Sequence, residues 1–337
     1  MALKDIVAIG GSLGSSSVIK RILGELPSDF PAAVLIATHM PGSGAGYLAE
    51  ALAGHSALPV CEAVDGQPIE HGHVYVAAPD RHLLLAGGTI LLGTGPRENM
   101  ARPAIDALFR SAALNFGPRV VGLVLSGLLN DGASGLHAIK AMGGTTIVQH
   151  PLDSEASEMP AAALQVVDAD HVGRIAELSG LLRQSAGQEA GPAPSPTPEL
   201  ELEVSIAAGR RLGSVELRRL ADPVPLVCPH CQGVLSQIKD SKPLRFRCQI
   251  GHAFTAEAVM ASAESGVGEA LRIAMRLMEE RAELVSRMAR DARESGRPAV
   301  AELYEARFAE YSSYAATLRR AATVDLIATR GDDAREI

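Results

Sequence analysis

The sequence predicts an α/β fold with a doubly wound, mostly parallel sheet, followed by a small cysteine-rich module and an α-helical hairpin. Strand and helix patterns alternate along the first half of the chain, which is typical of β-α-β units. Residues 120–125 (VVGLVL) are apolar at every position, as expected of a parallel strand covered by helices on both faces. Aliphatic residues are plentiful, whereas there are no Trp, six Phe and five Tyr, which favours an α/β domain over a β-sandwich.

The first domain, assigned to residues 1–183, begins with a β-α-β unit. We expect a strand at 6–9, a helix at 17–26 and a second strand at 33–38. Further strands are expected at 74–77, 83–92 (a hairpin broken at Gly87-Gly88), 120–125 and 145–148, and further helices at 46–53, 103–115, 134–142 and 159–166.

The amino-acid composition of the chain changes after this domain. Residues 184–200 are rich in Pro and Gly and lack periodic apolar residues, which predicts a linker. A cysteine-rich module at 201–255, a helical hairpin at 256–324 and a tail at 325–337 are expected to follow. The hairpin is predicted from a break at 295–298 and from heptad-like spacing of Leu271, Met275, Met278, Ala282, Val285 and Ala289. This apolar stripe either closes the core of the hairpin or binds a partner.

The charge and hydropathy of the chain exclude several classes of protein. The formal net charge of -8 is spread along the 337 residues, which argues against general binding to nucleic acids or anionic membranes. No apolar run reaches the roughly 20 residues that cross a bilayer, and Met1 to Gly11 lacks the features of a signal peptide. We therefore expect a cytoplasmic protein without membrane insertion.

A nucleophile-elbow pattern, Gly-x-Ser-x-Gly, lies where the first strand should turn into the first helix. Residues 10–14 (GGSLG) would expose the hydroxyl of Ser12 above the sheet edge, near a helix N-terminus that favours developing negative charge. A glycine-rich phosphate-binding loop is the alternative for this segment. Gly-x-Gly-x-x-Gly does not fit, however, and no Gly-Lys-Ser/Thr follows.

Two further residues at strand ends are suited to activate such a serine. His39 follows the second strand, and Asp131 follows the strand at 120–125. Because the carboxyl ends of parallel strands meet at one edge of a sheet, we expect both side chains to lie near Ser12, as base and orienting carboxylate. The alternative for Asp131 is an Asx turn or an N-cap for the helix near residue 134.

The order Ser, His, Asp differs from the Ser, Asp, His order of α/β-hydrolases, which disfavours that fold. Residues 5 to about 182 instead resemble the catalytic domain of the chemotaxis protein-glutamate methylesterase (CheB-type) family along nearly its whole length. The segments that carry the resemblance are IGGSLGS (9–15), THMP (38–41), YVAAPDRHLLL (75–85), RPAIDALFRSAA (102–113), LSGLLNDGASGL (125–136) and QHPLDSEASEMP (149–160).

The resemblance implies a serine hydrolase that demethylates glutamate methyl esters on chemoreceptors or related chemosensory proteins and releases methanol. Deamidation of glutamine is expected at the same site, because both substrates pass through a glutamyl-serine ester. Ser12 would be the nucleophile, His39 the base and Asp131 the orienting carboxylate. The oxyanion would be held by the main-chain N–H groups of Leu13 and Leu128, and no cofactor is expected for catalysis.

This sequence departs from the family pattern at several points. The family usually has Thr after the nucleophile and Met-Gly before Asn-Asp, whereas this chain has Leu13 and Leu128-Leu129. Main-chain donors survive a change of side chain, so the departures bear on substrate preference rather than on catalysis. The best-known members also begin with a phosphorylatable receiver domain, whereas here the catalytic domain starts at residue 5. We therefore expect control to come from the C-terminal region or from a separate regulator bound through it.

The cysteine-rich module contains a metal-ligand pattern. Cys228 and Cys231 form Cys-x2-Cys, and after sixteen residues Cys248 and His252 form Cys-x3-His. This spacing predicts a closed tetrahedral zinc site on a zinc-ribbon-like hairpin, with metal-free reduced thiols as the alternative. His230 is a substitute ligand.

Basic residues are in excess around this metal-ligand pattern. Eight basic residues oppose three acidic ones between Gly209 and His252. Only Phe246 and Phe254 offer platforms for stacking bases, so protein docking is favoured over nucleic-acid binding. Two other functions remain open for the whole chain: a non-catalytic signalling adaptor that uses the C-terminal module, and a broader carboxylic-ester hydrolase.

Overall fold

The computed structural model describes residues 2–39 and 46–331. They fall into two compact units, Met1–Val259 and Met260–Ile337. The first unit is built around a seven-stranded parallel sheet of strand order β3-β4-β2-β1-β7-β8-β9. Its strands are β1 (Ile6–Gly11), β2 (Ala33–Thr38), β3 (Val60–Glu62), β4 (Val74–Val76), β7 (Val120–Val124), β8 (Thr145–Gln149) and β9 (His171–Gly173). The prediction of a doubly wound, mostly parallel sheet is confirmed.

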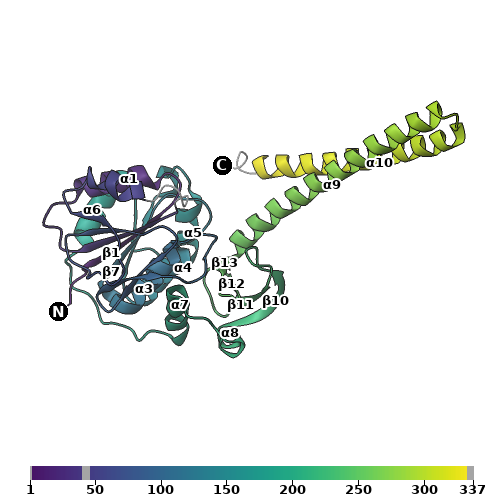
Figure 1. Ribbon diagram of the computed structural model, residues 1–337. Helices are drawn as coiled ribbons and strands as arrows, with labels where there is room; N and C mark the ends of the chain where they lie inside the picture. The colour runs from purple at the N-terminus through teal and green to yellow at the C-terminus, as the bar shows by residue number, and fades with distance from the viewer. Residues whose placement is uncertain (1, 40–45, 332–337) are drawn as a thin grey trace. The chain divides into compact units, whose positions relative to one another are not determined.

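Helices cover both faces of this sheet, as Figure 1 shows for α1 and α6 on one face and α3 and α4 on the other. The first face is covered by α1 (Ser15–Glu25), α2 (Gly46–Ala53) and α6 (Ile175–Ser185), and the second by α3 (Ile105–Phe116), α4 (Ala133–Ala141) and α5 (Glu158–Val166). Alternate residues of β1 point to opposite faces. Val7 and Ile9 therefore enter one apolar core, and Ile6 and Ala8 enter the other.

A two-stranded hairpin packs against α3. Its strands, β5 (His82–Ala86) and β6 (Thr89–Gly93), flank the predicted break at Gly87-Gly88. Two short 3-10 helices, η1 (Gly117–Arg119) and η2 (Pro151–Asp153), complete this part of the chain. The hairpin and α3 carry the chain from β4, next to the edge strand β3, back to β7 at the middle of the sheet.

The segment at 184–200 pairs with the start of the chain. Gly187 donates its main-chain N–H to Lys4 O at 2.8 Å, and Lys4 N donates to Gln188 O at 2.8 Å. Helix α7 (Pro198–Ala208) begins within this segment, because Pro is well suited to a first helical position and Thr197 Oγ1 accepts the N–H of Leu200 at 3.3 Å. Helix α8 (Ser214–Leu220) follows.

A second sheet forms the cysteine-rich module and belongs to the same compact unit as the parallel sheet. Its four antiparallel strands are β10 (Ala221–Val227), β11 (Val234–Ile238), β12 (Arg245–Cys248) and β13 (Ala253–Thr255). Phe246 and Phe254 pack with Cys228, Cys248 and Leu235 in its small core. The two phenylalanines are buried, so they offer no exposed platform for stacking bases.

The last part of the chain is the predicted helical hairpin, formed by α9 (Ala256–Glu294) and α10 (Pro298–Gly331). Arg293 on α9 pairs with Glu305 on α10 at 2.8 Å. Ala282, Val285 and Ala289 of the predicted apolar stripe are buried. Among the described residues, no helix is both long enough and apolar enough to span a bilayer.

Candidate functional site

Ser12 occupies the turn between β1 and α1. Gly14 adopts a left-handed conformation (φ 78°), which lets the chain turn directly from the strand into the helix at Ser15. Ser12 donates its main-chain N–H to Ser126 O at 2.9 Å, and its own carbonyl accepts the Ser15 N–H at 3.1 Å. These bonds hold the turn against the loop that follows β7.

The register of the parallel sheet sets the spacing between Ser12 and His39. Gly11 of β1 pairs with Thr38 of β2, so Ser12 and His39 leave neighbouring strands at the same level. The main-chain N–H of His39 donates to Gly11 O at 3.4 Å, which continues the ladder by one step. Both residues therefore lie at the carboxyl edge of the sheet, where ligands bind in open α/β sheets.

His39 and Asp131 form a direct hydrogen bond, with 2.7 Å between Nε2 and Oδ2. The Asp131 side chain is 1% exposed and the His39 side chain 24% exposed, so the imidazole has an accessible face. Asp131 also accepts the main-chain N–H groups of Ile105 (2.7 Å) and Asp106 (3.1 Å) in the first turn of α3. Such N–H groups lack partners inside the helix and favour a negative charge.

These donors keep Asp131 ionised. Burial by itself raises the pKa of this carboxyl group, but the hydrogen bond and charge of His39 and the two α3 N–H groups outweigh burial and hold the pKa below its ordinary value. The alternative role of Asp131 as an N-cap of α4 is not observed, because α4 starts after Gly132 without a side-chain cap.

Two residues beside Asp131 were missed by sequence reasoning. The Asn99 Nδ2 group donates to Asp131 Oδ1 at 3.1 Å and to Asp106 Oδ2 at 3.2 Å, so one amide bridges two carboxylates. Burial first, and then the charge of Asp131, raise the pKa of Asp106 to about 7. A left-handed backbone at Asn99 (φ 48°) marks this position as unusual, but the sequence gives no sign of it beyond the residue type.

The N–H groups of Leu13 and Leu128 lie on the two loops that meet at Ser12. Neither donates a hydrogen bond within the described part of the chain, whereas the neighbouring N–H of Leu129 donates to Glu158 Oε2 at 2.6 Å. The side chains of Leu13 and Leu128 are 50% and 47% exposed. These two loops thus present free main-chain donors and exposed apolar side chains.

The two loops leave no room for a side chain at Gly127. A Cβ atom there would lie 2.0 Å from Met159 Sδ and 2.8 Å from Ser12 Cβ. The site therefore depends on a glycine directly before Leu128.

Cys228, Cys231, Cys248 and His252 gather into one cluster, with all four ligand atoms within 4.8 Å of one another. The sulfur atoms of Cys231 and Cys248 are 3.7 Å apart, and His252 Nδ1 lies 3.5 Å from Cys248 Sγ and 3.9 Å from Cys228 Sγ. Burial lowers the pKa of His252 to about 4, so its imidazole is neutral, as a metal ligand must be. This group could hold a metal ion.

His230 is placed beside the cluster rather than in it. Its ring packs against that of His252 with 4.4 Å between centroids. The His230 ring thus covers the His252 ring, which belongs to the cluster.

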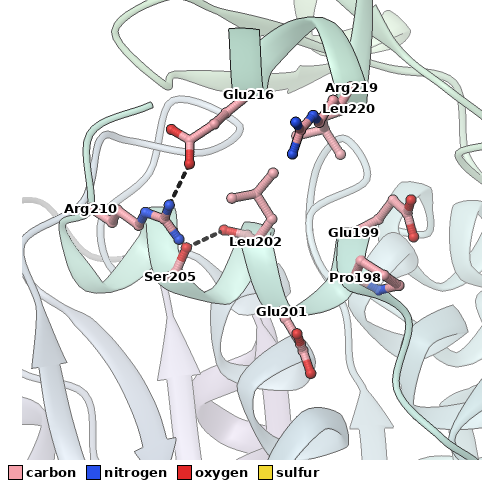
Figure 2. A pocket seen from close by; sticks show the side chains of 9 residues that line it. All are labelled: Pro198, Glu199, Glu201, Leu202, Ser205, Arg210, Glu216, Arg219 and Leu220. Atoms are coloured by element: carbon pink, nitrogen blue, oxygen red, sulfur yellow. Dashed lines mark hydrogen bonds and ion pairs between the residues drawn. The ribbon is translucent and has the colours of Figure 1, made fainter. Parts of the chain in front are cut away.

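A separate pocket of about 470 Å³ lies between α7 and α8, and its lining is drawn in Figure 2. Arg210 and Glu216 form an ion pair in its lining, and Ser205 Oγ donates to Leu202 O at 2.7 Å. None of the predicted site residues lines it; the lining is Pro198, Glu199, Glu201, Leu202, Ser205, Arg210, Glu216, Arg219 and Leu220.

Comparison with known proteins gives a consistent set of relatives. Residues 7–182 match the family model described as CheB methylesterase. The chain is 37% identical over 179 residues to protein-glutamate methylesterase/protein-glutamine glutaminase 2 of Methanosarcina mazei, covering 51% of this chain and 49% of that protein. It is 39% identical over 171 residues to protein-glutamate methylesterase/protein-glutamine glutaminase 1 of Xanthomonas euvesicatoria pv. vesicatoria, covering 50% of this chain and 48% of that protein.

A solved structure is similar as well. The crystal structure of the Thermotoga maritima CheB methylesterase catalytic domain superimposes with a TM-score of 0.52 at 31% identity, covering 53% of this chain and 97% of that chain. The chain spans about half the length of the curated relatives it matches.

Proposed function

Because the chain belongs to the CheB methylesterase family, we propose that it is a serine hydrolase that demethylates glutamate methyl esters on chemoreceptors or related chemosensory proteins. The observation that carries the proposal is the His39–Asp131 hydrogen bond at the sheet edge where the Ser12 turn lies. The same site would deamidate glutamine, in line with the double names of the relatives.

In the proposed reaction, His39 accepts the Ser12 hydroxyl proton on Nδ1, because its Nε2 is bonded to Asp131. The Ser12 oxygen attacks the ester carbonyl carbon, and the tetrahedral intermediate breaks its bond to the methoxy oxygen. His39 passes the proton to that oxygen, so methanol leaves. Water then attacks the glutamyl-serine ester with His39 as base, which releases glutamate and restores Ser12.

We assign the oxyanion donors to the main-chain N–H groups of Leu13 and Leu128. The absence of an acceptor for either group in the described residues supports this assignment, because an oxyanion hole needs donors that are not already engaged. Each donor of this kind contributes on the order of 3 kcal/mol to lowering the barrier.

Zinc is the metal that best fits the Cys3His cluster. Ligand atoms at about 2.0–2.3 Å from a tetrahedral zinc ion are separated by about 3.5–3.8 Å, and the three separations above are 3.5–3.9 Å. Four protein ligands leave no open position, so the ion would stabilise the module rather than take part in hydrolysis. Thiolate ligands of this kind stay reduced in a compartment such as the cytoplasm, where we place the chain.

We also propose which part of the chain carries which function. Residues 1–183 would carry catalysis, and residues 201–255 would form the zinc-ribbon-like module, joined by 184–200. The hairpin at 256–324, with the tail at 325–337, would then receive a regulator. Exposed apolar side chains on the hairpin, such as Leu277 and Leu284, support a docking role.

The exposed side chains of Leu13 and Leu128 favour one second candidate, a broader carboxylic-ester hydrolase. Apolar walls beside the nucleophile would accept small apolar esters as readily as a methylated glutamate. A panel of small esters, compared with methylated receptor as substrate, separates the two functions.

The proposal is tested by incubating the purified chain with methylated receptor and measuring methanol. Ser12→Ala should abolish release, whereas Ser17→Ala, which changes an exposed serine in the first turn of α1, should not. Equal release from the wild type and Ser12→Ala would overturn the proposal. Loss of receptor binding on deleting 260–337, the second compact unit, without any effect of Ser12→Ala in cells, would instead indicate an adaptor.

A further inference from the structure

Asn99 connects the catalytic carboxylate to the cysteine-rich module. Its side-chain Nδ2 bridges Asp131 and Asp106, and its Oδ1 accepts the main-chain N–H of Thr255 on β13 at 3.0 Å. Its own main-chain N–H donates at 2.8 Å to the carbonyl oxygen of Ala253, two residues before Thr255 on the same strand. Asn99 is 7% exposed, so these bonds are shielded from water.

A second set of contacts from β13 and α9 reaches Asn130. The Thr255 hydroxyl donates to Asn130 Oδ1, and Asn130 Nδ2 donates to Glu257 Oε2 in the first turn of α9. Asn130 directly precedes Asp131 in the chain. Strand β13 and the residues after it therefore hold both the side-chain partner of Asp131 and its main-chain neighbour.

The same strand starts at the cysteine cluster. His252, a member of the Cys3His group, is followed directly by Ala253, and its carbonyl accepts the Cys248 N–H at 3.0 Å. A metal bound at the cluster would fix His252 and so fix the first residue of β13. Only two residues, Ala253 and Asn99, then connect His252 of the cluster to Asp131.

The Asn99 backbone explains why support is needed. Both Asn99 (φ 48°) and Met100 (φ 65°) adopt left-handed conformations that side chains other than glycine rarely take. Such conformations persist where surrounding contacts impose them. The contacts here are the main-chain bonds of this segment to β13: Asn99 N to Ala253 O, and Ala253 N to Arg97 O at 3.3 Å.

We propose that Asn99 is a positioning residue for Asp131, and that the metal-loaded cysteine cluster holds it in place through β13. The inference rests on the proposed function, in which Asp131 orients His39. Asn99 places a hydrogen-bond donor between two carboxylates that would otherwise face one another, and thereby keeps Oδ2 of Asp131 directed at the imidazole. Loss of the metal, or of the amide, would loosen the same hydrogen bond.

The first experiment compares Asn99→Ala with Asn115→Ala in the full chain. Asn115 also makes three amide hydrogen bonds, to Leu85 O, Ser111 O and Gly87 N, away from the site. Asn99→Ala should lower kcat for ester hydrolysis about 10- to 100-fold with little change in KM, as partners of catalytic and metal-binding groups do. Asn115→Ala should leave both parameters near wild type.

The second experiment tests the metal. Cys231→Ala, which removes one ligand of the cluster, should lower kcat, and Cys61→Ala, a thiol outside it, should not. Because both changes act on one chain of contacts, Asn99→Ala with Cys231→Ala should be no slower than the slower single variant. If the fold-losses in kcat of the two single variants multiply in the double variant, the coupling is overturned. It is also overturned if chelation leaves kcat of the wild type unchanged and added Zn²⁺ then has no effect on the rate.

A third readout does not depend on activity. The proton shared by His39 and Asp131 can be followed by NMR of histidine-labelled chain, including inactive Ser12→Ala. Its resonance should shift in Asn99→Ala, in Cys231→Ala and, to a smaller extent, in Thr255→Val, which replaces the hydroxyl by a methyl group. If the resonance responds but no methanol is released, the positioning stands and the methylesterase proposal fails. Methanol release with an unresponsive resonance overturns the positioning.

Discussion

Arg247 of β12 and Glu98, which precedes α3, form a fully buried ion pair with 3.1 Å between Nη2 and Oε1. Arg247 also pairs with Glu203 of α7 at 3.1 Å, and Glu98 pairs with Arg110 of α3. The two arginines thus tie the parallel-sheet domain, α7 and the cysteine-rich sheet into one interior. The network joins three carboxylates to three guanidinium groups: Asp106, Glu98, Glu203, Arg110, Arg245 and Arg247.

Replacing Arg247 by Met should destabilise the chain by about 3–5 kcal/mol, because Glu98 and Glu203 would keep their negative charges without this partner inside the protein. Urea unfolding followed by circular dichroism measures the change. Arg218→Met alters an exposed arginine of the same module and should stay within about 0.5 kcal/mol of wild type. Equal stability of the two variants would contradict a structural role for the network.

Asp106 should impose a pH dependence on folding. Its pKa is about 7 in the folded chain and about 4 when unfolded, so between these values the folded state binds the additional proton. Stability should therefore fall as pH rises from about 4 to 7, by an amount on the order of a few kcal/mol. Asp131, whose pKa is lowered, contributes stability that is lost only below about pH 4. Unfolding measured at several pH values should show the slope in wild type and a flatter one in Asp106→Asn.

Gly127→Ala should reduce both activity and stability. The new methyl group would overlap Met159 Sδ and Ser12 Cβ, and overpacking of this kind typically costs about 1–3 kcal/mol. The Met159 side chain can yield, whereas displacement of Ser12 should lower the rate of labelling by a serine-directed phosphonate.

Gly180→Ala provides the control for Gly127→Ala. A Cβ atom at Gly180 in α6 meets nothing within 4 Å, and alanine favours a helix. It should therefore be neutral or stabilising. A labelling rate in Gly127→Ala equal to that of the control would mean that the Ser12 turn tolerates a side chain there.

The cysteine cluster should bind one Zn²⁺ per chain, measured by elemental analysis of the purified protein. Cys228→Ala should abolish stoichiometric binding, whereas Cys61→Ala should retain it. Chelation should lower Tm of the wild type, because metal binding to the folded chain adds to its stability. A wild type without zinc, whose Tm is also unchanged by added zinc, would contradict the assignment.

Much of the parallel sheet was predictable because its signals are local. The strands at 33–38 and 120–125 are almost entirely apolar runs, and the structure has strands there. The three-residue edge strands β3 and β9 were not predicted, since short strands carry too little pattern to separate them from loops. Helix α7 was also missed, although Thr197-Pro198 is a recognisable helix start, because the prolines before it dominated the segment.

Part of the candidate site was likewise predictable from local signals, and part was not. Ser12, His39 and Asp131 could be selected because each follows a strand, and parallel strands bring their ends together. Asn99 and Glu98 lie in an irregular segment, and their partners Thr255 and Arg247 are about 150 residues away along the chain. No local pattern encodes a contact of that kind, so the union of the module with the catalytic domain emerged only from the structure.

The pairing of Gly11 with Thr38 makes the spacing between Ser12 and His39 independent of the length of chain that joins them. Residues between β1 and β2 can be gained or lost in the course of evolution while the two side chains keep their places. One residue inserted within β2, by contrast, would advance His39 by about 3.3 Å and turn it to the opposite face of the sheet. Among related sequences, insertions and deletions should therefore be found in the connection at 26–32 and be rare within the strands.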